Sequence, residues 1–263
     1  MRRALTFLAS TLTASAVLAA AAPAVPTVPK NQKGEGVLTV RAQPVAQPKP
    51  GKWRLVRLSG GGGGGLAVIP DRAEALIERT GTAEERGNAY GEISLLASLW
   101  SRSNLPGRLS VAREGDRFKI AAEGKAGPAA DPQSGHNALG DLTAFLATLE
   151  LRMDAWGALA TFTGIAVGTE TNGLSLGLAQ RDPVLGDLTA NLAAVREEKG
   201  VPVAEIGLQV PRGITKAFME KQLADRTAAF TRRTGAALVT KLELKSEPRV
   251  VSAAAAAGSS PHP

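Results

Sequence analysis

The sequence contains no cysteine among its 263 residues and only two histidines, His136 and His262. Without thiols the chain forms neither disulfides nor thiolate metal sites. A zinc site needs three or four protein ligands, and no Asp/Asn loop has the spacing of a calcium site. We therefore expect no metal, no cofactor and a fold that is held together by burial alone.

Aromatic residues are also scarce, at 4% of the chain. They are scattered rather than interleaved with basic residues, so the platform on which nucleic-acid bases stack is missing. The formal net charge is +7, or +5 without Arg2 and Arg3, and Arg212 to Arg249 hold nine Lys or Arg against four Asp or Glu. We expect no nucleic-acid partner. The basic C-terminal region is interpreted either as a site for an anionic envelope component or as a solvated helix face.

Reactive groups are few. The six glycines Gly60–Gly65 are followed by an apolar segment instead of the Lys and Ser/Thr of a phosphate-binding loop, so we interpret them as a surface loop. Asp131, Ser134 and His136 lie close together in a Gly/Pro-rich segment, and a hydrolase that uses His136 is kept as an alternative. Such a segment does not hold a triad rigidly. We therefore expect a protein that is not an enzyme.

The N-terminus has the three parts of a secretory signal. Arg2 and Arg3 precede a short apolar run, and small residues follow, with cleavage expected after Ala19, Ala20 or Ala24. We predict a signal peptide over residues 1–24 and a periplasmic or secreted protein. An uncleaved membrane anchor is the alternative.

Composition divides the remaining chain into three parts. Residues 25–51 are Pro-rich and are predicted to be a linker, residues 52–247 a single domain, and residues 248–263 a disordered tail. Within the domain, residues 60–65 form the Gly-rich loop and residues 124–135 an inserted loop. A strand at Val37–Val40 is predicted to pair with Trp53–Leu58 as the first hairpin.

A short repeat dominates the centre of the sequence. Leu139-Gly140-Asp141-Leu142-Thr143-Ala144 returns as Leu185-Gly186-Asp187-Leu188-Thr189-Ala190. Each copy is predicted to open an amphipathic helix, over Asn137–Arg152 and Pro183–Lys199, with leucine stripes that rest on one sheet. Asp182 is the expected N-cap of the second helix, and Gly200 its left-handed end.

Hydrophobic periodicity predicts the other elements. We expect further helices over residues 71–79, 84–102 and 213–234, and strands over residues 108–113, 117–123, 160–168, 173–179, 202–210 and 237–245. Together these elements predict an α+β fold, a mostly antiparallel sheet covered by several amphipathic helices. In the helix 213–234, Met219, Leu223 and Phe230 lie roughly opposite Ile214 and Ala217. We expect one side to pack on the sheet and Met219, Leu223 and Phe230 to mediate self-association into a homo-oligomer.

The segment 160–248 resembles the C-terminal half of the SIMPL domain family of exported bacterial proteins. The resemblance is carried in order by Thr171–Leu178, Arg181–Leu188, Ile206–Leu208, the alanine-rich stretch Ala217–Thr234 and Gly235–Leu244. It implies an α+β domain outside the cytoplasm, no cofactor, homo-oligomers including rings, and an association with envelope or oxidative stress. The N-terminal half departs from the family pattern.

A second resemblance covers Glu92–Ala179. Its expected order of helix, two strands, helix and two strands is similar to the ferredoxin-like periplasmic modules of type IV pilus and type II secretion assembly proteins. These families normally keep a membrane helix and a preceding coiled coil, which this sequence does not show clearly. A pilus or type II secretion assembly protein is therefore the alternative to the SIMPL-like envelope protein.

Overall fold

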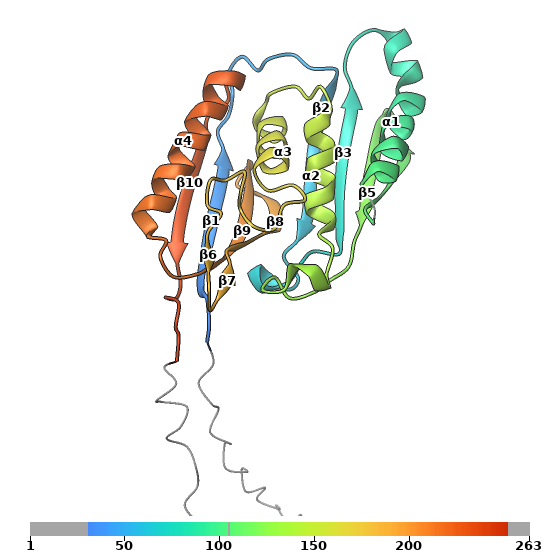
Figure 1. Ribbon diagram of the computed structural model, residues 1–263. Helices are drawn as coiled ribbons and strands as arrows, with labels where there is room; N and C mark the ends of the chain where they lie inside the picture. Colours follow the sequence, from blue (N-terminus) through green and yellow to red (C-terminus); the bar gives the residue numbers. More distant parts are fainter. Residues whose placement is uncertain (1–30, 105, 252–263) are drawn as a thin grey trace, which may run out of the picture.

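The computed structural model describes residues 31–104 and 106–251, and it shows an α+β architecture. Eight antiparallel strands form one sheet in the order β10-β1-β9-β8-β2-β3-β5-β4. Figure 1 shows the four helices lying over one face of this sheet. The α+β class and the antiparallel sheet are therefore confirmed. The predicted signal peptide, the first residues of the linker and most of the tail lie outside the described residues.

The elements have the following bounds. The sheet contains β1 (Gly34–Ala42), β2 (Trp53–Gly61), β3 (Arg72–Arg79), β4 (Arg108–Glu114), β5 (Arg117–Glu123), β8 (Thr189–Glu198), β9 (Val201–Val210) and β10 (Leu238–Leu244), and β6 (Arg181–Asp182) pairs separately with β7 (Gly186–Asp187). The helices are α1 (Ala83–Ser103), α2 (Ala138–Thr148), α3 (Ala155–Ala166) and α4 (Lys216–Thr234), with 3₁₀ turns at Gly65–Ala67 and Pro132–Ser134.

Two four-stranded halves meet at a narrow junction. Only Gly60 and Gly61 of β2 pair with β8, opposite Val195 and Ala194. A Cβ on Gly61 would overlap the backbone carbonyl oxygen of Ala193 in β8, so a side chain is excluded at this position of the junction. The glycine run is thus partly strand, and the surface loop predicted at residues 60–65 begins only after Gly61.

Strand β1 corrects the predicted linker and the predicted first hairpin. Gly34–Ala42 lies between β9 and β10, with Leu38, Val40 and Ala42 buried in the core. The domain therefore includes residues 34–42 of the predicted linker 25–51, and Val37–Val40 do not pair with Trp53–Leu58. The partners of β1 lie more than 150 residues away in the sequence. A prediction that pairs strands which are neighbours in the sequence therefore misses them.

Several elements agree with the sequence. Helix α1 begins with a capping box at Thr82 and Glu85, and β4 and β5 form the predicted hairpin with a positive φ at Gly115. Helix α2 starts at the N-cap Asn137, and α4 ends at Gly235 in the left-handed conformation. Strands β9 and β10 also occur where they are predicted.

Three predicted elements are wrong in type. Residues 71–79 form β3 instead of a helix, and residues 160–168 belong mainly to α3, which Asp154 caps, instead of a strand. Residues 173–179 form turns. A period of two fits β3, where Ala73, Ala75 and Ile77 are buried, but in an alanine-rich segment this period is hard to distinguish from a helical one.

The second copy of the repeat is also a strand rather than a helix. After β7, residues 189–198 form β8, whose first seven residues are buried, and Lys199 and Gly200 turn the chain into β9 with φ values of 52° and 79°. A strand that is buried on both sides has a continuous apolar sequence, which periodicity does not separate from a buried helix. The leucine stripe from 139 rests on the sheet as predicted, whereas the one from 185 does not form.

Helices α2 and α3 pack unusually closely. Gly164 lies against the backbone carbonyl of Thr143, and Gly140 against that of Gly168, where added Cβ atoms would overlap those oxygens. Helix α2 covers β3 and β5, while α3 covers β1, β2 and β9. This helical hairpin therefore covers the junction between the two half-sheets.

The pilus-like alternative predicts an element order that the structure does not have. Between Glu92 and Ala179 the chain forms α1, β4, β5, α2 and α3. Two helices follow the hairpin, and the second pair of strands that a ferredoxin-like module needs is missing from this described segment.

Candidate functional site

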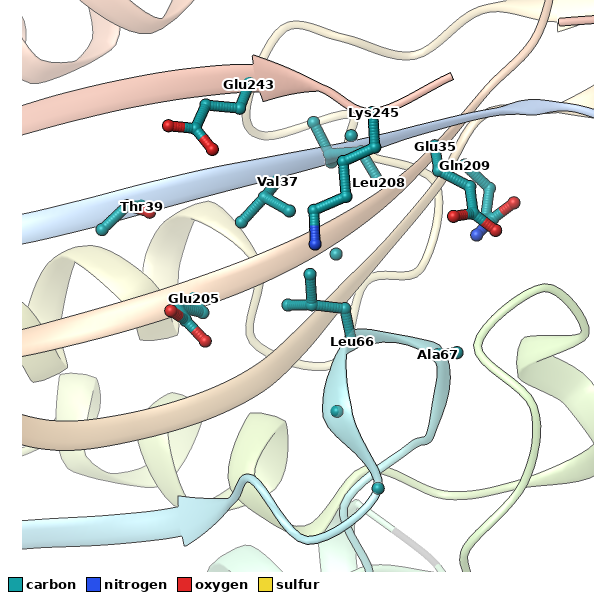
Figure 2. Close-up of a pocket in the computed structure, with 14 residues that line it drawn as sticks. Glu35, Val37, Thr39, Leu66, Ala67, Glu205, Leu208, Gln209, Glu243 and Lys245 are labelled. Carbon is teal, nitrogen blue, oxygen red and sulfur yellow. The ribbon is translucent and has the colours of Figure 1, made fainter. Parts of the chain in front are cut away.

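A groove of about 530 Å³ opens on the sheet face that the helices leave uncovered. Figure 2 shows Val37 of β1 and Leu66 of the glycine-rich segment, with the Lys245 side chain extending between them. The loop that contains Leu66 crosses the sheet at Gly207, where a Cβ would lie 2.7 Å from the Leu66 carbonyl oxygen. The groove is therefore made by the glycine-rich segment folding back over β9.

Two of the three carboxylates that line the groove, Glu205 and Glu243, are engaged in ion pairs. Glu205 Oε1 accepts a hydrogen bond of 2.7 Å from Arg196 Nη2, which lowers the pKa of Glu205. Lys241 similarly binds Glu243 and lowers the pKa of that carboxylate. Both groups are thus ionised near neutral pH. The groove therefore offers a charged surface for binding.

A smaller cavity of about 80 Å³ lies beside His136. Its walls come from the inserted loop, the start of α2, the segment after α3 and the start of β8. His136 Nε2 is hydrogen-bonded to Asp141 Oδ2, and the Asp141 side chain is only 2% exposed. Burial raises the pKa of Asp141, while the adjacent His136 opposes this shift. The pair fastens the inserted loop to the first turn of α2.

Two asparagines complete the polar lining of this cavity. Asn137 Oδ1 caps α2 by accepting a hydrogen bond from Gly140 N at 2.9 Å, and its Nδ2 donates to Asn191 Oδ1 at 2.9 Å. Asn191 Nδ2 donates in turn to the Val68 carbonyl at 3.1 Å. These bonds join α2, β8 and the glycine-rich segment, so both amides have structural partners.

The hydrolase alternative requires Ser134, His136 and Asp131 to act together. Ser134 Oγ instead donates a hydrogen bond of 2.7 Å to the backbone oxygen of Asp131, and the imidazole binds Asp141. Proximity in the sequence therefore does not produce a triad here. Sequence reasoning missed Asp141 as the partner of His136, although an acidic residue in the first turn of the predicted helix was a usable signal.

Sequence reasoning also missed a Gly-x-Ser-x-Gly motif at Gly173–Gly177. A nucleophile elbow places such a serine between a strand and a helix. Here the motif follows helix α3 and lies in turns, and Ser175 Oγ donates a hydrogen bond of 2.6 Å to Glu170 Oε1. The serine is thus bound to a carboxylate rather than to an imidazole.

The predicted self-association face is wrong. Met219, Leu223 and Phe230 are 0%, 1% and 2% exposed. Phe230 packs edge-to-face on Phe162 of α3 at 5.4 Å between ring centroids. These three side chains belong to the core between α4 and the sheet and do not reach a second copy.

Ion pairs engage four of the nine cations in the basic C-terminal region. The pairs are Arg212–Asp182, Lys216–Glu220, Lys221–Asp225 and Lys241–Glu243. Such pairs favour a solvated surface, and an anionic envelope component stays a prediction. Within residues 31–104 and 106–251, no group of three or more His, Asp or Glu side chains is arranged to hold a metal ion.

Comparisons with known proteins leave the family open. No family model matches the sequence, and no curated protein matches it. Among solved structures, aminoacylhistidine dipeptidase from Vibrio alginolyticus aligns with 84% of this chain at 10% identity and a TM-score of 0.30. The chain spans 46% of the length of that enzyme. In the described part of the chain, no helix has the length and apolar character needed to cross a membrane.

Proposed function

We propose that this chain is an exported, non-catalytic α+β protein of SIMPL type that acts in the bacterial envelope by self-association or by binding an envelope component. We further propose a periplasmic or secreted location and a role in envelope or oxidative stress. The signal-like N-terminus supports export. The order of β9, α4 and β10 supports the SIMPL resemblance, although its segment Thr171–Leu178 forms turns here.

One observation carries the non-catalytic part of the proposal. The hydroxyls of Ser134 and Ser175 donate to Asp131 and Glu170, while His136 binds Asp141. A serine nucleophile needs a base within hydrogen-bond reach of its hydroxyl, normally an imidazole that a third group orients. The three candidate groups are each engaged elsewhere, which favours a binding protein over a hydrolase.

Active-site labelling tests the non-catalytic part. A fluorophosphonate probe, which reacts with activated serines, should leave the purified protein unlabelled. The Ser175→Ala and Ser134→Ala variants are the matched controls. Labelling of the wild-type protein that one of these substitutions abolishes would overturn the proposal.

Fractionation of expressing cells tests the exported part. The mature protein should be found outside the cytoplasm with an N-terminus between Ala20 and Val25, measured by intact mass. A chain that lacks residues 1–24 is the control and should stay in the cytoplasm. A full-length cytoplasmic protein contradicts export and the envelope role.

Complementation tests the role itself. In a deletion strain under oxidative or envelope stress, a His136→Asn variant that folds should restore growth as well as the wild-type protein does. Loss of complementation by this folded variant would assign His136 a chemical role and refute the proposal.

A further inference from the structure

Helix α1 exposes three leucines to solvent. Leu95, Leu99 and Leu96 are 60%, 50% and 36% exposed, whereas Ala89 and Ala97 are buried with Ile93 against the sheet. A surface helix normally turns its bulkiest apolar residues toward the core. Contiguous exposed leucines of this kind are typical of an interaction surface.

The exposed residues follow the spacing of a helix-packing seam. Positions 92, 95, 99 and 102 are separated by three, four and three residues, and they carry Glu92, Leu95, Leu99 and Arg102. This spacing places Leu95, Leu99 and Arg102 on the side of α1 opposite Ile93, and Glu92 lies at the edge of that side, next to Arg79. The seam therefore has two central leucines, an acidic residue toward its N-terminal end and a basic residue toward its C-terminal end.

We propose that this seam binds a second copy of the chain, with the two α1 helices antiparallel about a two-fold axis. In this arrangement Leu95 faces Leu99 of the second copy, and Glu92 faces Arg102 of the second copy. Each contact occurs twice because the axis relates the copies. A parallel arrangement would instead bring Glu92 against Glu92 and Arg102 against Arg102, which like charges disfavour.

The position of α1 leaves room for this partner. Strand β4 is the last strand of the sheet, and α1 lies at that end of the helical layer (Figure 1). On its other side Trp100 contacts Phe145 of α2, with ring centroids 6.2 Å apart. Glu92 is held by Arg79 Nε at 3.3 Å, which orients its carboxylate before association.

This inference deepens the self-association part of the proposed function and rests on it. The symmetric contact closes on itself, so it predicts dimers rather than filaments. Its test uses purified protein, whereas export and the absence of an activated serine are tested separately. A dimer that persists without Leu95 and Leu99 would therefore refute the seam alone, whereas a monomeric wild-type protein would refute the self-association part as well.

Sedimentation velocity on the protein as the cell produces it tests the seam. We expect the wild-type protein to change from monomer to dimer between about 1 and about 100 µM. The variant Leu95→Ser/Leu99→Ser should need at least about tenfold more protein to dimerise, because the central apolar contacts are lost. The control Leu174→Ser/Val184→Ser, which removes two other exposed apolar residues, should dimerise like the wild-type protein.

Charge reversal tests the antiparallel pairing. Arg102→Glu places two carboxylates together at each end of the seam and should weaken the dimer about tenfold. Adding Glu92→Arg restores opposite charges and should recover the dimer. Because Glu92 also contacts Arg79, the melting temperature of each variant is measured as well.

Three results would overturn the proposal. These are a wild-type monomer throughout the concentration range, a dimer that persists without both leucines, and a monomer that binds phospholipid vesicles through Leu95 and Leu99. Failure of the double charge swap to recover the dimer, at an unchanged melting temperature, would overturn the antiparallel arrangement.

Discussion

Gly61 lies directly against the backbone carbonyl oxygen of Ala193, at the point where the two halves of the sheet meet. Its φ of 71° is in the left-handed region, and a Cβ at this position would overlap the Ala193 oxygen. The neighbouring Gly62 N donates a hydrogen bond of 3.3 Å to the same oxygen. The continuity of the eight-stranded sheet therefore depends on a residue without a side chain.

Gly61→Ala should consequently destabilise the protein by about 3 kcal/mol or more, through the overlap and the unfavourable φ. Chemical denaturation measures this loss. Gly63→Ala, two residues further along the same run, has open space around the added methyl group. Its free energy of unfolding should therefore stay within about 0.5 kcal/mol of the wild-type value. Equal effects of the two substitutions would contradict the junction.

Asp141→Asn tests the buried partner of His136. Burial raises the pKa of Asp141 above its ordinary value of 3.8, so the folded state favours the protonated carboxyl. Ionisation is then costly to the fold, and the wild-type protein loses stability relative to Asp141→Asn as the pH rises from 3.8 to the folded-state pKa.

The difference in melting temperature between the two proteins should thus grow across this window and level off above it. Asp131→Asn, at an exposed position in the inserted loop, is the control and should show no such trend. The substitution His136→Asn should lower the free energy of unfolding by about 1 to 3 kcal/mol at neutral pH, because it removes the hydrogen-bond partner of the buried Asp141 carboxylate.

Asp182→Asn should show the opposite pH dependence. Arg212 Nε at 2.8 Å and the backbone N–H groups of Leu185 and Val184 hold the pKa of Asp182 far below its ordinary value of 3.8. The ionised carboxylate therefore stabilises the fold above pH 3.8, and this contribution is lost as the pH falls through the folded-state pKa.

The wild-type protein should accordingly melt at a higher temperature than Asp182→Asn at neutral pH. The difference between the two melting temperatures should begin to shrink below about pH 4 and should keep shrinking as the pH falls towards the folded-state pKa. A difference that stays constant down to pH 2 would show that the charge of Asp182 does not contribute to stability.

Leu188→Asp tests the burial of Leu188 in the second copy of the repeat. Leu188 is fully buried where β7 leads into β8, so a carboxylate there should cost at least about 3 kcal/mol. Leu174→Asp is the matched control, because Leu174 is 61% exposed and should tolerate the charge. Thermal unfolding distinguishes the two outcomes.

Local signals in the sequence account for the elements that were predicted correctly. The capping box at Thr82, the turn at Gly115 and the C-terminal Gly235 mark ends that neighbouring residues alone specify. For the same reason the leucine stripe of α2 indicated its buried face. The candidate site was predicted less well, because the partners of His136 and Ser175 depend on which segments meet in space.

The sequence by itself determined the α+β class, the helices α1, α2 and α4 and the β4–β5 hairpin, since periodicity, caps and turn residues act over a few residues. Only the tertiary structure decided that β1 lies between β9 and β10, that the second repeat becomes β8, and that Met219 faces inward while Leu95 faces solvent. Strand pairing and burial depend on contacts between distant segments. The hydrophobic periodicity of a segment predicts that it has an apolar face, but it does not indicate which other segment covers that face.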